Sequence, residues 1–455
     1  MNPQRPRSTK GPNVIYVFAD QWRWCDTGYA GNPQVRTPHL DAFAAASINF
    51  THAVAGCPVC SPARASMMTG RYPTTHGVFV NDVPLSTDAV SLAQAFAAGG
   101  YDTAYIGKWH IDGHGRSNYI PPERRQGFDY WKVLECTHSY NESYYYDGND
   151  PTKRMWEGYD AIAQTDDAAA YVRDHADADK PFLLVLSWGP PHAPYETAPK
   201  QYRDLYRPED IELRPNVPPE MADKARQWIA GYYAHCTALD DCFASLLKTI
   251  DEAGIADDTV VIFTSDHGDM LGSQGEVKKQ RPWEESIRVP MLARVPGGPA
   301  GKALNATIDT ADLMPTMLGL AGLPNPDTVE GHDFSGYMLR GEDDPSKGAA
   351  VLNCVHPFGQ FTRDIGGREY RGLRTGRYTY VRDLNGPWLL YDNENDPYQL
   401  TNLADDPTHA ALRAELDADL DRRLAARGDR FEPSEAYLAQ WGYEVDEKGT
   451  VPYTW

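Results

Sequence analysis

The sequence predicts an α/β fold: a large, mostly parallel sheet flanked by helices, with a smaller C-terminal subdomain of antiparallel sheet and helix. Three observations predict this class. Four short runs are continuously apolar, the pattern of strands buried on both faces, and segments of helical periodicity separate them. Beyond Gly341 the pattern changes to short alternating runs, which are typical of an antiparallel sheet. At 455 residues, the chain is long enough for both parts.

Each of the four apolar runs ends in polar side chains. The runs cover residues 13–19, 101–107, 182–186 and 259–265. Ligands bind beyond the carboxyl ends of the strands in open α/β sheets, so we expect these ends to meet at one edge. A single Asp, Lys or His there is most often a turn former, a solvated charge or a structural residue, and only their convergence indicates a site. The polar residues at these ends are Asp20, Gln21, Lys108, His110, His192, Asp266 and His267.

The run Cys60-Ser61-Pro62-Ala63-Arg64 predicts a cysteine at the start of a short helix. Ser61 is a good N-cap, Pro62 fits the first helical position, and Gly70 is placed to end the helix after two turns. Free backbone N–H groups and the helix dipole favour negative charge near Cys60, and Arg64 lies on the same helix face. The run therefore predicts a site for an anion or an activated nucleophile.

Composition excludes several classes of function. The net charge of −21 argues against general binding to nucleic acid or to an anionic membrane surface. Residues 1–12 lack the apolar stretch of a signal peptide and no later run could span a bilayer, so we expect a cytoplasmic location unless a leader has been trimmed. Cys57 and Cys60 match the spacing of a redox pair or half a zinc site, but no second cysteine pair accompanies them.

The polar residues divide into two chemical sets. The set that offers oxygen and nitrogen donors to one divalent cation consists of Asp20, Gln21, Asp266 and His267. It suits Ca²⁺, Mg²⁺ or Mn²⁺ better than Zn²⁺, which prefers a tetrahedral shell of nitrogen and sulfur. The set of hydrogen-bond donors suited to a tetrahedral oxyanion and its leaving group consists of Arg64, Lys108, His110 and His192.

The same motifs resemble those of the type I sulfatases, in the alkaline phosphatase superfamily. Cys-x-Pro-x-Arg followed by Thr69-Gly70-Arg71 is similar to the family signature, and Gly107-Lys108-Trp109-His110 is similar to a second element. Later landmarks of the family match residues 264–269, Lys279 with 283–290, 309–317 and 391–397. The motifs occur in the family's order across about residues 13–407.

The resemblance implies a modified cysteine. Cys60 would be oxidised by a formylglycine-generating enzyme to formylglycine, whose hydrate attacks the sulfur of a sulfate ester. The hydrate would bind one divalent cation, with Ca²⁺ the expected ion and Mn²⁺ or Mg²⁺ as alternatives. The implied metal ligands are position 60 together with Asp20, Gln21, Asp266 and His267.

The resemblance also implies how the sulfate is held and released. Arg64 and Lys108 would hold the nucleophile and spread its charge. His192 or Lys279 would protonate the departing alkoxide as a general acid. The residues that would bind the sulfate oxygens are Lys108, His110, His192 and Lys279.

Two positions depart from the pattern of many sulfatases. Gln21 stands where a second Asp is common, and His267 stands where Asn is common. An amide in place of a carboxylate removes negative charge from the metal shell, which makes Mn²⁺ more plausible. The Asp-Gln-Trp-Arg run at residues 20–23 and the Asp266-His267 pair also resemble the phosphonate monoester hydrolases. A phosphonate monoester or phosphodiester hydrolase is therefore the alternative enzyme. A binding protein with unmodified Cys60 is the non-enzymatic alternative.

Segments between the motifs predict how a substrate is bound. Residues 135–146 mix aromatic and hydrogen-bonding side chains, which suits a sugar, although tyrosines packed on the domain explain the mixture equally well. The expected substrate is a sulfated saccharide or another sulfated small molecule. The candidate substrate-binding residues are His138 and Asn141 in this region and His356, Arg363 and Arg368 in the smaller subdomain.

A linker at residues 341–348 divides the chain. Residues 12–340 are expected to form the catalytic domain and residues 349–455 the smaller subdomain. The tail 441–455 is rich in Tyr and Trp, so it is expected to pack down on the chain or on another subunit of a homo-oligomer. The expected elements of the subdomain are strands in 350–356, 370–382 and 387–392 and an amphipathic helix over 408–427.

Overall fold

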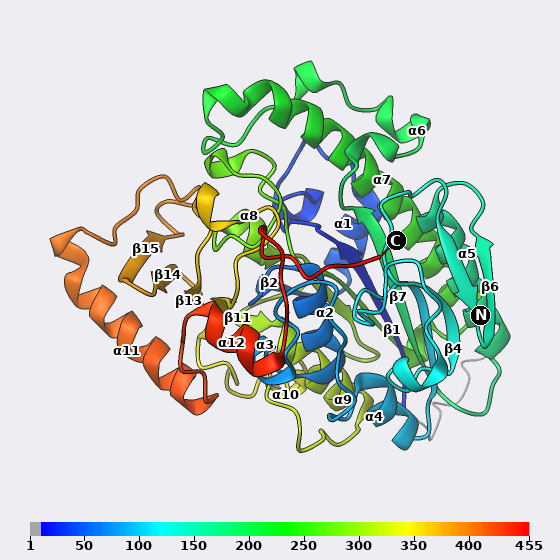
Figure 1. The fold of residues 1–455 in the computed structure, drawn as a ribbon. Coiled ribbons are helices and arrows are strands. Elements are labelled where there is room, and N and C mark those ends of the chain that lie inside the picture. Colours follow the sequence, from blue (N-terminus) through cyan, green and yellow to red (C-terminus); the bar gives the residue numbers. More distant parts are fainter. Residues whose placement is uncertain (1–10, 455) are drawn as a thin grey trace.

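A large mixed sheet forms the centre of the computed structural model, which describes residues 11–454 (Figure 1). Its strands are β1 (Asn13–Asp20), β2 (Ile48–Val54), β3 (Asp102–Lys108), β4 (Tyr130–Leu134), β5 (Tyr144–Asp147), β6 (Asp150–Met155), β7 (Phe182–Pro191), β8 (Thr259–Ser265), β9 (Arg288–Val289), β10 (Met291–Arg294) and β11 (Lys302–Asp309). They follow the order β11-β2-β10-β8-β1-β7-β3-β4-β5-β6, with β9 paired to β2. The central strands β8, β1, β7, β3 and β4 run parallel, and antiparallel pairs flank them. The predicted α/β class is confirmed.

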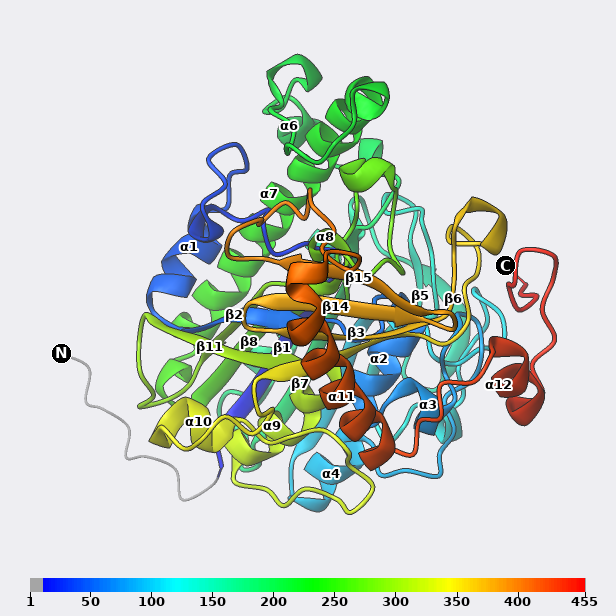
Figure 2. The ribbon, with the colours of Figure 1, turned by 90° about the vertical axis from the view of Figure 1, so that its left-hand side faces the viewer.

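Helices cover both faces of this sheet, as the continuously apolar strands predict (Figures 1 and 2). The helices of the chain are α1 (Pro38–Ala45), α2 (Cys60–Thr69), α3 (Pro73–His76), α4 (Leu92–Ala98), α5 (Asp160–His175), α6 (Lys200–Arg203), α7 (Ala222–Glu252), α8 (Glu284–Ile287), α9 (Leu313–Ala321), α10 (Ser335–Arg340), α11 (Ala410–Ala426) and α12 (Ser434–Trp441). In β1, Tyr16 and Phe18 pack in one core with α2, α4 and α9, whereas Ile15 and Val17 pack in a second core with α1, α5 and α7. Alternate side chains of one strand thus anchor the helices of both layers.

The ends of the central strands meet at one edge of the sheet. Asp20 is the last residue of β1 and pairs with Pro191 of β7, while Ala19 pairs with Ser265 of β8. Strand β7 continues five residues beyond the apolar run at 182–186, because Ser187 pairs with both β1 and β3. The strand register therefore brings the polar residues after these four strands together.

A second, antiparallel sheet lies beside the first, as predicted. It consists of β12 (Ala349–Cys354), β13 (Tyr370–Thr375), β14 (Tyr378–Asp383) and β15 (Gly386–Asp392), in that order. The run at 370–382 is a hairpin of two strands rather than one. Helix α11 covers one face through Leu416, Leu420 and Leu424 (Figure 2), and the other face packs on Val54 and Ile287 of the large domain.

The C-terminal tail packs on the large domain of the same chain. The hydroxyl of Tyr443 donates to the carbonyl of Gly77 at 3.1 Å, and the backbone N–H of Arg116 donates to the carbonyl of Thr454 at 2.7 Å. Residues 1–10, on which the expected cytoplasmic location largely rests, and Trp455 lie outside the described residues. No helix in the described part of the chain combines the length and the apolar character needed to cross a membrane.

Candidate active site

Helix α2 presents Cys60 in its first turn. The predicted N-cap, Ser61, is wrong: Val59 is the N-cap and the helix begins at Cys60. The reason is tertiary, because the side-chain oxygen of Asn81 accepts the Ser61 N–H at 3.1 Å and caps the helix from another segment. Gly70 ends the helix as predicted, in the left-handed conformation with φ of 65°. Cys60 therefore lies where the helix dipole favours negative charge.

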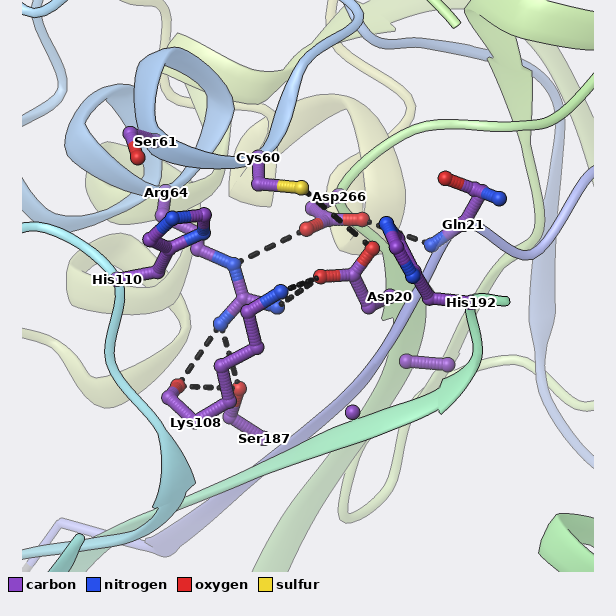
Figure 3. A network of polar contacts seen from close by, with 12 residues as sticks. Asp20, Gln21, Cys60, Ser61, Arg64, Lys108, His110, Ser187, His192 and Asp266 are labelled. Carbon is purple, nitrogen blue, oxygen red and sulfur yellow. Dashed lines mark hydrogen bonds and ion pairs between the residues drawn. The ribbon is translucent and has the colours of Figure 1, made fainter. Parts of the chain in front are cut away.

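The Cys60 thiol points toward a buried group of metal-ligating side chains (Figure 3). Its Sγ lies 3.6 Å from Asp20 Oδ1 and 3.3 Å from His267 Nε2. Ligand atoms from Asp20, Cys60, Asp266 and His267 all lie within 4.8 Å of one another, and all four residues are buried. The carbonyl of Gly268 lies 2.9 Å from His267 Nδ1, so Nδ1–H can donate there and leave the Nε2 lone pair facing the carboxylates.

This donor set fits a divalent cation. Burial and the charge of Asp20 raise the pKa of Asp266, because two adjacent carboxylates in a buried site repel each other. A bound cation would relieve this repulsion. Two carboxylates with one imidazole are compatible with Ca²⁺, Mn²⁺ or Mg²⁺.

Gln21 lies beside the carboxylates, in a left-handed conformation with φ of 74°. Its backbone N–H donates to Asp266 Oδ1 at 3.0 Å. Its side-chain amide donates to Asp269 Oδ2 at 2.5 Å, and its side-chain oxygen accepts from Lys279 Nζ at 2.8 Å. The oxygen therefore faces Lys279 in this structure, and its role as a metal ligand stays a prediction.

Arg64 and Lys108 balance the charge of the two carboxylates. Arg64 donates through Nε to Asp266 at 3.0 Å and through Nη2 to Asp20 at 3.1 Å, and Lys108 Nζ lies 2.6 Å from Asp20 Oδ2. Although burial opposes ionisation, Lys108, reinforced by other nearby cations, holds the pKa of Asp20 well below its usual range. The third guanidinium nitrogen, Nη1, donates to Ser187 Oγ at 2.8 Å, which fixes the guanidinium to β7.

Lys279 contacts the Cys60 thiol, and His192 lies between the cluster and a neighbouring cavity that it lines. Lys279 Nζ donates to Cys60 Sγ at 3.2 Å. Burial and Asp20 oppose ionisation of Cys60, but Lys279 and other cations hold its pKa well below the usual range. His192 Nδ1 lies 2.7 Å from the carbonyl of Ala193, and burial together with the Lys279 charge lowers the pKa of His192.

His110 approaches from the opposite side of Arg64 (Figure 3). Its Nε2 lies 3.7 Å from Asp82 Oδ1, and its backbone N–H donates to Glu135 Oε2 at 3.1 Å. Although burial opposes protonation, the neighbouring Cys136 and Asp82 raise the pKa of His110 well above its usual value. A protonated imidazole at this place would suit an oxyanion.

The predicted substrate-binding residues are scattered. His138 stacks on His192, with ring centroids 4.8 Å apart, and both line a cavity of about 410 Å³ beside the cluster. Asn141 donates to the carbonyl of Thr197 at 2.9 Å, outside the residues that line this cavity.

The three candidates from the smaller subdomain are engaged elsewhere. His356 Nε2 lies 2.9 Å from the carbonyl of Gly449 in the tail. Arg363 forms an ion pair with Glu369 at 2.6 Å, and Arg368 forms one with Asp383 at 3.0 Å. None of the three is among the residues that line the cavity.

Sequence reasoning missed several residues around the site. Asp269 and Ser187 follow two of the strands that were used to find the site, and that position could have indicated them. Tyr195 and Trp228 carried no such signal, because they come from loops and helix α7 that only tertiary packing brings to the cavity. Lys278 was not predicted, although it directly precedes the predicted site residue Lys279, and its side chain lines the cavity.

Comparisons with known proteins agree with this geometry. The family model described as "Sulfatase" matches residues 12–323, and a model described as "N-sulphoglucosamine sulphohydrolase, C-terminal" matches residues 272–426. An ulvan-active sulfatase of Formosa agariphila is 45% identical over 455 residues, which cover 99% of this chain and 88% of the relative.

Solved structures share the fold over almost the whole chain. A Bacteroides fragilis protein that is provisionally assigned as a sulfatase aligns with a TM-score of 0.86 and 30% identity, covering 97% of this chain and 99% of the other. The phosphonate monoester hydrolase of Agrobacterium radiobacter aligns with a TM-score of 0.74 and 25% identity, covering 96% and 99%. The chain therefore belongs to the sulfatase family, within the alkaline phosphatase superfamily, and is a sulfuric ester hydrolase.

Proposed function

We propose that this sulfatase removes sulfate from a saccharide, and that position 60 supplies the nucleophile after conversion of Cys60 to formylglycine. The observation that carries the proposal is the buried group of Asp20, Cys60, Asp266 and His267 at the start of a helix. A saccharide is supported by the name of the ulvan-active relative and by the mixed aromatic and polar lining of the adjacent cavity.

The family implies formylglycine and a divalent cation, and both fit the residues present. When bound, the cation supplies Lewis acidity that favours an ionised oxygen nucleophile and polarises the sulfate. We propose Ca²⁺ as the ion, with Mn²⁺ as the alternative favoured by the amide of Gln21 in place of a second carboxylate. Asp20, Asp266 and His267 would hold it, together with position 60 and Gln21.

The chain's own residues then orient the ester and stabilise charge. Arg64 holds Asp20 and Asp266 in place, and Lys108 adds a further contact to Asp20. Lys108, Lys279 and His110 would donate to the sulfate oxygens, where they stabilise negative charge that develops as the bond to the bridging oxygen breaks.

A proton must reach the bridging oxygen as it leaves. Hydrolysis breaks the bond between sulfur and this oxygen, which departs as an alcohol once it is protonated. His192 lines the cavity, where the alcohol would leave, and Lys279 contacts Cys60 Sγ. With Nδ1–H donating to the Ala193 carbonyl, His192 would give a proton from Nε2 only as the doubly protonated ring, which its lowered pKa disfavours, so the ammonium of Lys279 is the better proton donor.

The proposal is tested by co-expression with a formylglycine-generating enzyme. We expect the mass of the Cys60 peptide to fall by the amount of the thiol-to-aldehyde change, and sulfate release from a sulfated saccharide to depend on this change. The Cys60→Ala variant, purified in parallel, is the control. Sulfate release by Cys60→Ala at the wild-type rate would overturn the proposed nucleophile.

A phosphonate monoester or phosphodiester hydrolase is the second candidate. It is favoured by Gln21 and His267 and by the structural likeness to a phosphonate monoester hydrolase. Comparison of kcat/KM on an aryl sulfate and a matched aryl phosphonate separates the two candidates. We expect the sulfate to be preferred, and a strong preference for the phosphonate would favour the second candidate.

A further inference from the structure

The cavity of about 410 Å³ lies beside the metal-ligating group. His192 and Asp269 line it, and Asp269 accepts a hydrogen bond from Gln21 at the edge of the metal-ligating group. Lys278, which also lines the cavity, precedes Lys279, whose ammonium contacts Cys60 Sγ. A sulfate ester held at Cys60 would therefore extend its alcohol portion into this cavity.

Lys278, which is partly exposed, brings a cation to the cavity, and the carboxylate of Asp269 on the same cavity attracts it without forming an ion pair. Among residues 11–454, its ammonium forms neither a hydrogen bond nor an ion pair within the protein, whereas Lys279 has two partners and Lys108 has one. Burial and the charge of Lys279 lower the pKa of Lys278, as expected for two adjacent ammonium groups. An oxyanion bound in the cavity would offset this repulsion.

The backbone holds Lys278 at the cavity. Its φ of 60° lies in the left-handed region, which is uncommon for a residue with a side chain and persists where the surroundings impose it. The carbonyl of Lys278 accepts the N–H of Met270 at 2.7 Å, and the N–H of Gln280 donates to the carbonyl of Pro58 at 3.0 Å. The loop is thus tied at Lys278 itself, to the loop after β8, and two residues later, to the segment before Cys60.

The rest of the cavity suits a sugar ring. Trp228, Leu271 and Val277 contribute apolar surface, and the face of an indole can stack on the C–H face of a sugar. The carboxylate of Glu196 also lines the cavity, and within the described residues it has no ion-pair partner, so it can accept hydrogen bonds from hydroxyl groups.

We propose that this cavity binds a saccharide unit that carries a second oxyanion, a carboxylate or a second sulfate, and that Lys278 selects it. The proposal rests on the proposed function and narrows its substrate to acidic saccharides. A chain with a net charge of −21 repels a polyanionic substrate at long range, so recognition of each anionic group requires a local cation. Arg64 is committed to Asp20 and Asp266, and the proposed function assigns Lys108, Lys279 and His110 to the sulfate that is hydrolysed, which leaves Lys278 for the second group.

The test compares matched substrates on formylglycine-bearing protein. A panel of sulfated disaccharides is used in three forms: with a uronate next to the sulfated sugar, with that uronate as its methyl ester, and with a second sulfate. An aryl sulfate without a second anion reports on the chemical step. The variants are Lys278→Gln and the charge reversal Lys278→Glu. The control is Lys248→Gln on the exposed face of α7, where Lys248 lies 3.6 Å from Glu252.

We expect the wild type to prefer the uronate or the disulfated form over the methyl ester by about tenfold in kcat/KM, the scale of one charge-assisted hydrogen bond at a partly exposed site. Lys278→Gln should remove the preference through KM, Lys278→Glu should reverse it, and the aryl sulfate should be cleaved within about twofold of wild type by all variants. Which of the two anionic forms is preferred identifies the source of the oxyanion.

Equal cleavage of the acidic and esterified forms by the wild type would overturn the subsite, as would a preference that survives Lys278→Gln, because Lys278 would then be only a solvated side chain. Cleavage of the aryl sulfate but of no saccharide in the panel would overturn the proposed function as well. The two failures are therefore distinguishable.

Discussion

Two walls of the active site differ in how their charges are satisfied. On the inner wall, at the strand ends, each carboxylate of Asp20 and Asp266 is paired with Arg64, at 3.1 and 3.0 Å, and Lys108 adds a third contact. On the outer wall, around the cavity, Lys278 and Glu196 have no ion-pair partner among the described residues. Reciprocal buried pairs hold one geometry, because loss of either partner leaves a charge uncompensated. An unpaired charged residue on a loop can be substituted without leaving a buried partner uncompensated.

The difference assigns different tasks to the two walls. Under the proposed function, the inner wall would hold the sulfate group, which is the same in every sulfate ester. The outer wall would contact the part of the substrate that varies, and its unpaired charges would be available to bind that part. Changes to the inner wall should therefore damage both stability and turnover, whereas changes to the outer wall should alter selectivity.

Removal of the cation should have the largest effect on activity. We expect exhaustive chelation to abolish sulfate release, because Asp20 and Asp266 would repel each other and the nucleophile would lose its Lewis acid. Turnover and the melting temperature are measured before and after chelation. Re-addition of Ca²⁺, Mn²⁺ or Mg²⁺ should restore both, and full activity in the chelated protein would contradict a metal-dependent inner wall.

Arg64→Ala should destabilise the fold by about 3 to 5 kcal/mol, because it leaves two buried carboxylates without their shared partner. Urea unfolding of the protein measures the change. The matched control is Arg71→Ala, since Arg71 lies 3.2 Å from the exposed Asp88 and should contribute less than about 1 kcal/mol. Equal losses in both variants would show that the inner wall does not depend on its buried pairs.

Asp160 tests what happens to a buried acid without a cation partner. Burial raises its pKa to about 7, from an ordinary value of about 3.8. Because the folded state favours the protonated form of Asp160, the free energy of unfolding falls as the pH rises from about 4 to about 7. Above about pH 7, the ionised carboxylate destabilises the folded state by the full amount. Asp160→Asn should therefore raise the free energy of unfolding by roughly 2 to 4 kcal/mol at pH 8.

The measurement is the free energy of unfolding by urea at pH 5 and at pH 8 for wild type and Asp160→Asn. The gain should be larger at pH 8 than at pH 5. A gain that is the same at both values would show that Asp160 is ionised in the folded protein across this range, despite its burial.

Tyr453 tests a contact of the tail and should have the smallest effect. Its ring lies 3.6 Å from the Arg116 guanidinium, which donates to both oxygens of Asp82 at 2.8 Å, and Asp82 in turn faces His110. We expect Tyr453→Ala to raise KM for an aryl sulfate by about two- to fivefold with little change in kcat, because an exposed cation–π contact contributes about 0.5 to 1 kcal/mol. Tyr453→Phe keeps the ring and should behave as wild type. Equal effects of the two variants would mean that the ring contact does not position His110.

Much of the inner wall could be predicted from the sequence because its residues follow local patterns. Asp20, Lys108 and Asp266 each end a continuously apolar strand, and parallel strands bring such ends to one edge. The helix start at Cys60 was also predicted, apart from its cap. The prediction of Ser61 as the cap was wrong because Asn81 caps the helix from another segment, a contact that no local pattern encodes.

The outer wall could be predicted only in part. His138 does line the cavity, but His356 and Arg363 do not, because His356 is engaged by the tail and Arg363 by Glu369. Trp228 reaches the cavity from the long helix α7, and its position depends on how that helix packs on β7. Loop and helix side chains acquire their neighbours from packing, which sequence periodicity does not specify.

By itself, the sequence determined the fold class, the sulfatase family and the residue types that gather at the strand ends. It did so because burial on both faces of a parallel sheet imposes a recognisable apolar pattern and leaves polar residues only at the ends. Only the tertiary structure decided which charges are paired and which are free. Pairing depends on distances of a few ångströms between segments that are far apart in the chain, as for Arg64 and Asp266. Lys278 is the opposite case, because it alone among the described lining residues supplies an unpaired cation to the cavity.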